Sequence, residues 1–326
     1  MRLPDARFGF GGRLAESFPS QVVLDVTEVC NLACVHCPHP EFKVGPLYGG
    51  RHLEPELAAK AVAEVAAHRA VVQYVRVSAN GEPLAHPRIF DILENAVRFG
   101  GVAVTLTTNG TLVDAGRAEK LLGTGVSMID VSIDAAREET YARVRGGRLE
   151  VTRANVLGLL ARKRASGAAT RVVVSFVEQA ENRAEAAEFE AFWLDAGADR
   201  VLVRRLHSNA GASAGIAHGL GAGDAPRYPC LYPWERVLVN ARGRLAFCPQ
   251  DWVHGSELAD YRDTTIAQVW GGAAYAGLRA AHRACAFGPE HGFCGRCPDW
   301  RTTRWPHQEG RAYADLVADV AGPKRS

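Results

Sequence analysis

The chain has 326 residues, of which 47% are hydrophobic, and this is enough to bury the core of a barrel plus a small second unit. The net charge of +2 indicates neither a nucleic-acid partner nor an anionic membrane surface, and no apolar run approaches the ~20 residues of a membrane span. The N-terminus lacks the apolar region of a secretory signal, so we expect a cytoplasmic protein. Eight cysteines in a reducing compartment then predict metal binding or catalysis and not disulfides.

Short Val- and Ile-rich runs alternate with helical stretches over the first two thirds of the chain. This alternation predicts right-handed crossovers and a parallel sheet, and six such units predict an α/β fold with a partial (β/α)6 TIM-like barrel. Asp114 and Asn182 are candidate helix N-caps. The expected strands are Gln21–Thr27, Tyr74–Ser78, Val102–Thr107, Met128–Ile133, Arg171–Val177 and Arg200–Arg204. The expected helices are Glu54–His68, Pro87–Phe99, Leu112–Gly123, Val151–Ala165 and Arg183–Ala196.

The composition changes after residue 208. A Gly- and Ala-rich stretch predicts a linker, and it is followed by a hairpin with its turn at residues 241–243. Beyond the hairpin, we expect a helix from Thr264 to about His282, and a tail helix at Glu309–Val320. The expected units are an N-terminal extension (1–20), the barrel (21–208), the linker (209–226), a small C-terminal domain (227–300) and a tail (301–326).

Three cysteines follow the first expected strand with the spacing C-x3-C-x2-C: Cys30, Cys34 and Cys37. Soft thiolate ligands favour iron–sulfur clusters or zinc. Three thiolates can hold three irons of a [4Fe–4S] cube and leave the fourth iron open to a small molecule. The alternative is a zinc site that His36 or His39 completes.

Further polar groups follow the ends of the later strands, where ligand sites form in parallel α/β folds. Glu82 lies in a Gly-Glu-Pro segment after the second strand. The YARVRGG segment, which carries Arg143 and Arg145, follows the fourth strand. The other candidates at strand ends are Gly81, Asn109, Ser132, Asp134 and Val177.

In this order, the motifs from about Gln21 to Arg205 resemble those of the radical S-adenosylmethionine (SAM) superfamily. The resemblance implies that Cys30, Cys34 and Cys37 hold a [4Fe–4S] cluster whose open iron binds the methionine part of SAM. Reductive cleavage of SAM then gives a 5'-deoxyadenosyl radical, which removes a hydrogen atom from the substrate. It also implies a reducing partner such as flavodoxin or ferredoxin.

The resemblance also assigns a SAM site. Glu82 would take the methionine ammonium group, and Arg145, with Arg143 as the alternative, would pair with the carboxylate. His36 stands where the family has a larger aromatic residue, and Asn80 replaces the first glycine of its GGE-type motif. The residues assigned to SAM are Gly81, Glu82, Asn109, Ser132 and Asp134 (ribose and carboxylate), Arg145, and Val177 (beside adenine).

A second set of cysteines resembles the SPASM/twitch extension of the same superfamily, which binds auxiliary clusters. The spacing fits the twitch version, with four ligands for one further [4Fe–4S] cluster, which would accept or relay electrons. A zinc site with four thiolates is the alternative. The residues concerned are Cys230, Cys248, Cys294 and Cys297.

Cys285 remains, either as a small buried apolar residue or as a hydrogen-atom donor to a substrate radical. The short segment before the first strand favours a small-molecule substrate over a ribosomal peptide. The resemblance to aminoglycoside-biosynthesis dehydrogenases and epimerases implies a sugar, cyclitol or aminoglycoside carbon bearing a hydroxyl group, which is oxidised or epimerised. His207 or Glu178 would be the base for oxidation. A peptide-modifying enzyme and a non-catalytic metal protein are the alternatives.

Overall fold

One curved sheet runs through the molecule. The structure, a computed structural model, describes residues 17–78, 80–219, 227 and 229–302. Within these residues the sheet has nine strands in the order β6-β5-β4-β3-β2-β1-β7-β8-β9, and β1 to β6 pair in parallel. The strands are β1 (Gln21–Asp25), β2 (Tyr74–Ser78), β3 (Ala103–Thr108), β4 (Met128–Ser132), β5 (Arg171–Glu178), β6 (Arg200–Arg205), β7 (Arg236–Val239), β8 (Arg244–Ala246) and β9 (Glu257–Asp260).

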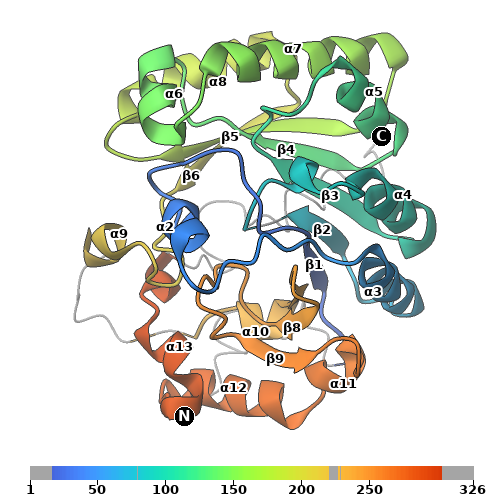
Figure 1. Ribbon diagram of the computed structural model, residues 1–326, viewed down its shortest axis with the longest axis vertical. Coiled ribbons are helices and arrows are strands. Elements are labelled where there is room, and N and C mark those ends of the chain that lie inside the picture. Colours follow the sequence, from blue (N-terminus) through green and yellow to red (C-terminus); the bar gives the residue numbers. More distant parts are fainter. Residues whose placement is uncertain (1–16, 79, 220–226, 228, 303–326) are drawn as a thin grey trace.

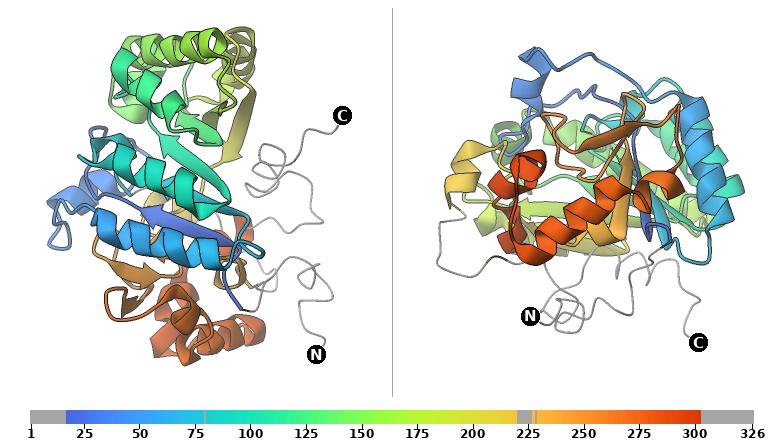
Figure 2. Two further views of the ribbon diagram at one scale, coloured as in Figure 1. Left: turned by 90° about the vertical axis from the view of Figure 1, so that its right-hand side faces the viewer. Right: turned by 90° about the horizontal axis from the view of Figure 1, so that it is seen from below.

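Helices follow the strands in alternation. The helices are α2 (His39–Val44), α3 (Pro55–Ala67), α4 (Ile89–Gly100), α5 (Ala115–Gly123), α6 (Glu138–Arg145), α7 (Leu149–Ser166), α8 (Ala186–Asp195), α9 (Ala214–Gly219), α10 (Tyr232–Glu235), α11 (Ile266–Trp270), α12 (Ala273–Ala284) and α13 (Gly292–Arg296). Figure 1 shows α3, α4, α5 and α7 on the outside of the sheet, and the left view of Figure 2 shows α3 and α4 lying across its strands. This arrangement confirms the predicted α/β partial barrel.

The main core lies between the strands and these outer helices. Helix α4 buries Ile89, Ile92, Leu93 and Ala96, a spacing of three and four residues that places them on one face. Strand β1 is buried at all five positions, as expected for a parallel strand that is covered on both sides. The helices therefore fix the strands whose carboxyl ends carry the candidate site.

The predicted hairpin forms, but it belongs to the barrel sheet. Strand β7 pairs in parallel with β1, with Arg236 opposite Gln21, and β8 and β9 continue the sheet in antiparallel fashion. The turn between β7 and β8 contains Gly243 at φ +72°, a backbone conformation that favours glycine. The C-terminal segment, orange to red in Figure 1, is thus joined to the barrel through backbone hydrogen bonds.

Several local predictions differ from the structure. The helix expected from Thr264 to His282 is two helices, α11 and α12, because Gly271 and Gly272 interrupt it. Helix α9 lies inside the predicted linker, and the short helices α2 and α6 were not expected. Asp114 caps α5, since its Oδ1 accepts a hydrogen bond from the backbone N–H of Arg117.

Some expectations fall outside the described residues, namely the tail helix at 309–320 and most of the N-terminal extension. In the part of the chain that the structure describes, no helix combines the length and apolar character needed to cross a bilayer.

Candidate active site

A cavity of about 600 Å³ opens at the carboxyl ends of the barrel strands. Its wall contains Cys30, Cys34 and Cys37, together with residues that follow β2 to β5. Most of the residues that the sequence assigned to SAM are brought together here: Gly81, Glu82, Asn109, Ser132, Arg145 and Val177.

The loop that carries the three cysteines is held from the β2 side by backbone contacts. Gly81 and Glu82 donate their N–H groups to the carbonyl oxygens of Thr27 and Val29, at 3.0 and 2.7 Å. A Cβ atom on Gly81 would lie 2.2 Å from the Val29 oxygen, so only glycine allows this approach. Gly81 is therefore required for the close backbone contact that holds the cysteine loop in this conformation.

The end of α6 holds the same loop from the other side. Ala33 and Val35 donate N–H groups to the carbonyl oxygens of Arg145 and Val144, at 3.3 and 3.0 Å. Gly146 follows at φ +70°, and a Cβ atom there would lie 3.2 Å from the Ala33 oxygen. Helix α6 thus positions the cysteine loop and delivers Arg145 to the cavity wall.

The three thiols of the loop suit a cluster. Burial raises the pKa of Cys30 to about 11 and that of Cys37 to about 12, so these free thiols stay protonated at neutral pH until bound iron displaces the proton. The backbone N–H of His39 already points to the Cys37 sulfur at 3.4 Å, a contact that suits a thiolate. Among the described residues, no three His, Cys, Asp or Glu side chains surround a single metal-ion position. A cubane cluster has a different geometry, because each thiolate binds a separate iron.

Glu82 is buried at the end of β2, and its carboxylate already accepts three hydrogen bonds. Oε1 accepts from Thr108 Oγ1 at 2.6 Å and from the Leu84 N–H at 3.0 Å, and Oε2 accepts from the Asn109 N–H at 2.7 Å. Burial raises the pKa of Glu82 despite these donors, because a buried carboxylate loses its hydration. A cationic group in the cavity would stabilise its ionised form.

Arg145 is the arginine that reaches the cavity, whereas Arg143 contacts Thr140 at 3.4 Å and does not line the cavity. The buried Arg145 guanidinium donates to Asp134 Oδ2 at 2.9 Å and to the Ser132 carbonyl oxygen at 2.7 Å. Its Nε is buried and has no hydrogen-bond partner within the described chain.

Asp134 is placed differently from the prediction. It is fully buried, does not line the cavity, and holds Arg145 and the backbone N–H of Val177, at 2.9 and 2.7 Å. Asn182, expected as a helix cap, makes no cap bond but donates to the carbonyl oxygens of Asp134 and Val177. These two residues hold the cavity wall and do not line the cavity.

His207 and Glu178, the two candidate bases, are separated by the structure. His207 lines the cavity, whereas Glu178 pairs with Arg183 at 3.1 Å and does not line it. Burial lowers the pKa of His207, so the imidazole is neutral at pH 7. Its Nδ1 accepts the Asn209 N–H at 3.3 Å, which leaves the proton on Nε2. His207 is therefore suited to donate a hydrogen bond rather than to act as a base.

The four later cysteines come together from three segments. Cys230 precedes α10, Cys248 follows β8, and Cys294 and Cys297 lie on and just after α13. Burial raises the pKa of Cys248 well above its usual value, and the other three thiols raise it further, which shows their proximity. Arg227 fixes this end of α13 through hydrogen bonds to the carbonyl oxygens of Cys294 and Gly295. Four clustered soft donors fit a fully ligated cluster.

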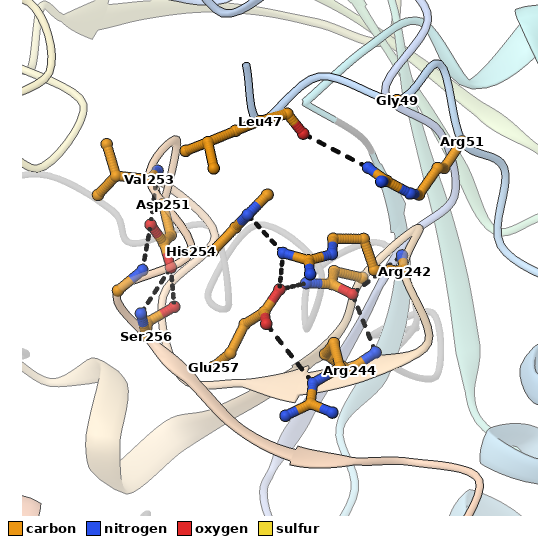
Figure 3. Close-up of polar contacts among 12 residues, drawn as sticks. Leu47, Gly49, Arg51, Arg242, Arg244, Asp251, Val253, His254, Ser256 and Glu257 are labelled. Carbon is orange, nitrogen blue, oxygen red and sulfur yellow. Dashed lines mark hydrogen bonds and ion pairs between the residues drawn. The ribbon is translucent and has the colours of Figure 1, made fainter. Parts of the chain in front are cut away.

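One carboxylate shapes the loop that follows β8. Asp251 accepts hydrogen bonds from the backbone N–H groups of Val253, Gly255 and Ser256, at 3.0, 3.1 and 2.6 Å (Figure 3). The loop presents Trp252 to the same cavity as the barrel residues.

Cys285 lies elsewhere. It ends α12 at φ +51°, and its thiol lies 3.1 Å from the Arg227 carbonyl oxygen, to which it can donate. Cys285 does not line the cavity, so the structure does not place it where a hydrogen-atom donor to a bound substrate would be.

The sequence reasoning missed several cavity residues. Arg76, Arg200 and Arg236 line the cavity from within or from the start of strands, together with Tyr232 and Trp252. A charged residue inside an otherwise apolar strand, as in YVRVS, was the signal that could have found Arg76, whereas Arg200 and Arg236 begin their strands and carry no such signal.

Comparison with known proteins agrees with this geometry. The model of the Radical SAM superfamily matches residues 24–189. The chain belongs to this superfamily. The SPASM iron–sulfur cluster-binding domain matches residues 230–298. The protein therefore binds SAM and a [4Fe–4S] cluster in its barrel and auxiliary iron–sulfur in its SPASM domain.

The curated relatives of this radical SAM protein match it over part of their length. An AdoMet-dependent heme synthase of Methanosarcina barkeri is 35% identical over 143 residues, or 42% of this chain and 38% of the relative. A GTP 3',8-cyclase of Pelotomaculum thermopropionicum is 36% identical over 128 residues, or 39% of this chain and 38% of the relative. The alignments thus span less than half of these relatives.

Two solved structures share the fold over most of the chain. SuiB of Streptococcus suis, bound to the precursor peptide SuiA, covers 98% of this chain and 79% of its own, with a TM-score of 0.64 and 15% identity. BtrN, in complex with AdoMet and 2-DOIA, covers 84% of this chain and 88% of its own, with a TM-score of 0.51 and 15% identity. At this identity the likeness concerns the fold alone.

Proposed function

We propose that this radical SAM enzyme oxidises a hydroxyl-bearing carbon of a small molecule to a ketone. One observation carries the proposal: a single cavity is lined by Cys30, Cys34 and Cys37 and also by neighbours of the auxiliary cysteines. Tyr232 lies two residues after Cys230, and Pro249 follows Cys248 directly. A substrate in this cavity lies between the two iron–sulfur sites.

The residues of the chain would have three roles: binding the first cluster, binding the auxiliary cluster and binding SAM. Cys30, Cys34 and Cys37 would hold the cluster, and Cys230, Cys248, Cys294 and Cys297 the auxiliary one. Gly81, Glu82, Asn109, Ser132, Arg145 and Val177 would form the SAM site, with Asp134 behind Arg145. When bound, these cofactors supply a radical that removes one hydrogen atom and an acceptor for one electron.

The balance of the reaction follows from the change of an alcohol to a ketone. Oxidation of an alcohol to a ketone removes one hydrogen atom, one proton and one electron: the SAM-derived radical would take the hydrogen atom, water the proton, and the cluster held by Cys230, Cys248, Cys294 and Cys297 the electron. The electron that starts the cycle comes from an external reductant of the flavodoxin or ferredoxin type. His207, with its proton on Nε2, would donate a hydrogen bond to a substrate oxygen and orient the reacting carbon.

Two observations support oxidation of a small molecule over the alternatives. Epimerisation requires a hydrogen donor on the second face, and Cys285 lies outside the cavity wall. A cavity of about 600 Å³ has the size of a small-molecule site, whereas a peptide substrate would extend beyond it.

Incubation of the reconstituted enzyme with SAM, dithionite and candidate polyols in deuterated water tests the proposal. Dehydrogenation predicts 5'-deoxyadenosine, together with a product that lacks two hydrogen atoms and carries no solvent deuterium on the reacting carbon. Deuterium at that carbon would indicate epimerisation, and turnover of a leader-bearing peptide alone would indicate peptide modification. Absence of 5'-deoxyadenosine under all conditions would contradict a radical SAM dehydrogenase.

A further inference from the structure

The cavity wall has a strong charge asymmetry. Among the described residues that line it, five are arginines and one is a carboxylate, Glu82. Arg145 belongs to the proposed SAM site, next to the cysteine loop. The other four form what we call the arginine wall: Arg76, Arg200, Arg204 and Arg236.

Three members of the arginine wall, Arg76, Arg200 and Arg236, lie deeper in the barrel than the SAM site, whereas Arg204 lies near the end of β6, opposite Val177. Arg76 is the third residue of β2, and Arg236 is the first residue of β7, next to the start of β1. The proposed SAM residues lie instead in the last residues of the strands or just after them. A molecule that fills the cavity would therefore meet the SAM site at one end and Arg76, Arg200 and Arg236 at the other, with Arg204 between them.

Arg204 and Arg76 reach the cavity from strands that are not neighbours, and both act on the imidazole of His207. Burial is the largest cause of the low pKa of His207; the charge of Asp299 opposes this shift, and the charges of Arg204 and Arg76 lower the pKa further. Arg204 extends from β6 and Arg76 from β2, so both guanidiniums come near His207. The neutral imidazole adds its Nε2–H to the donors of this region.

Three acids near the wall, Asp130, Glu235 and Asp299, do not line the cavity. Asp130 is fully buried in β4 and accepts from Arg204 at 2.5 Å, and its other oxygen accepts from Ser175. Glu235 pairs with Arg236 at 3.1 Å. Arg76 donates to Thr107 Oγ1 at 3.1 Å. The planar guanidinium fork has the geometry that matches carboxylate and phosphate groups.

We infer that the substrate carries an oxyanion, a phosphate or a carboxylate, which binds at the arginine wall while its hydroxyl-bearing carbon faces the SAM site. This inference rests on the proposed function and narrows its substrate class. A polycationic aminoglycoside would place ammonium groups against guanidiniums in a partly desolvated cavity, where like charges repel strongly. Among sugars and cyclitols, the structure thus favours phosphorylated or acidic ones.

Four probes that share one ring test the inference: glucose 6-phosphate, glucuronate, glucose and glucosamine. Binding to the reconstituted enzyme with SAM, without reductant, is measured by calorimetry at two salt concentrations. At least one of the two anions should bind about tenfold or more tightly than glucose, and glucosamine should bind most weakly. The dissociation constants of glucose 6-phosphate and glucuronate show whether the arginine wall binds a phosphate or a carboxylate more tightly.

Arg76→Gln and Arg204→Gln should each reduce anion binding about tenfold, with little change for glucose. Arg183→Gln is the matched control, because Arg183 pairs with Glu178 and does not line the cavity. Since Arg204 neutralises the buried Asp130, the thermal stability of its variant is measured as well, and Arg76→Gln carries the test if that variant unfolds.

Three results would overturn the inference: glucosamine binding as tightly as the anions, no detectable anion binding, or an anion preference that survives both substitutions. Each leaves the proposed dehydrogenation standing if 5'-deoxyadenosine and a ketone still form. Conversely, anion binding at the wall without any SAM cleavage would contradict the proposed function alone.

Discussion

The two cysteine sites of this protein are built in opposite ways. Cys30, Cys34 and Cys37 come from one short loop after β1, whereas the auxiliary cysteines are contributed by three segments between residues 230 and 297. Both sites end in the same turn, since Cys37 donates its N–H to the Cys34 carbonyl oxygen at 3.1 Å and Cys297 donates to Cys294 at 3.2 Å. A C-x2-C turn is thus formed by local sequence in both sites. The sites differ in which segments of the chain contribute the remaining cysteines.

The two sites depend on the fold in different ways. The first loop is fixed by contacts to β2 and α6 on its two sides, so its shape follows from the barrel. The auxiliary site requires β7 to join β1, α10 to follow Cys230, and α13 to be held by Arg227. Loss of one ligand should therefore have different consequences at the two sites.

The largest effect is expected for Cys34→Ala. Removal of a ligand from the first site should reduce 5'-deoxyadenosine formation by at least ~10³-fold, because the cluster that binds SAM is lost. The measurement is chromatography of anaerobic reactions with dithionite, together with iron analysis. Cys285→Ala is the control and should retain SAM cleavage, since Cys285 does not line the cavity. Retained cleavage in Cys34→Ala would contradict the ligand assignment.

Cys248→Ala should distinguish the roles of the two iron–sulfur sites. Bound iron should fall by about half, from about eight per chain to about four, while SAM cleavage continues and ketone formation is lost. Iron analysis and product mass spectrometry on the same sample provide the test. If the ketone still forms at an unchanged rate, the auxiliary site is not the electron acceptor.

Arg145→Gln should weaken SAM binding at the first site. Loss of one charge-assisted contact predicts a rise in the KM for SAM of about ten- to a hundredfold. Arg143→Gln is the matched control, because Arg143 contacts Thr140 outside the cavity. Since Arg145→Gln leaves Asp134 buried without its cation, the double variant with Asp134→Asn is measured in parallel. An equal KM in both single variants would remove Arg145 from the site.

The smallest effect concerns Asp25, which is buried between the loops of the two sites. Burial raises its pKa from 3.8 to about 7, and the charges of Glu28 and Asp251 raise it further. A raised folded-state pKa gives stability that is fully present below pH 3.8 and is lost as the pH rises through 7. Relative to Asp25→Asn, the wild type should lose about 2–3 kcal/mol of unfolding free energy between pH 5 and pH 8.

Anaerobic urea unfolding of both proteins at the two pH values measures this difference, and comparison with the variant cancels the contributions of other titrating groups. A pH-independent difference would show that Asp25 does not titrate between these values.

Much of the barrel could be predicted from the sequence. Each buried parallel strand is a short Val/Ile-rich run, and its length and the alternation of such runs with helical stretches identify it as a strand. The same holds for the order of motifs after the strands, which places Cys30, Glu82 and Arg145 at one edge. The pairing of β7 with β1 could not be predicted, since a hairpin sequence does not show which strand it will join. Two adjacent glycines mark the break at Gly271–Gly272 in the sequence, although the residues around them predict a continuous helix.

The six-stranded parallel barrel could be derived from the sequence alone, because it depends on local periodicity, and the order of the motifs after the strands carried the resemblance that implied the family and its cofactors. Only the tertiary structure decided that Asp134 faces Arg145 and not the cavity, that Cys285 lies outside it, and that four arginines from β2, β6 and β7 share one wall. Such relations join residues that are distant in sequence, and they are fixed by the curvature of the sheet and by the packing against it.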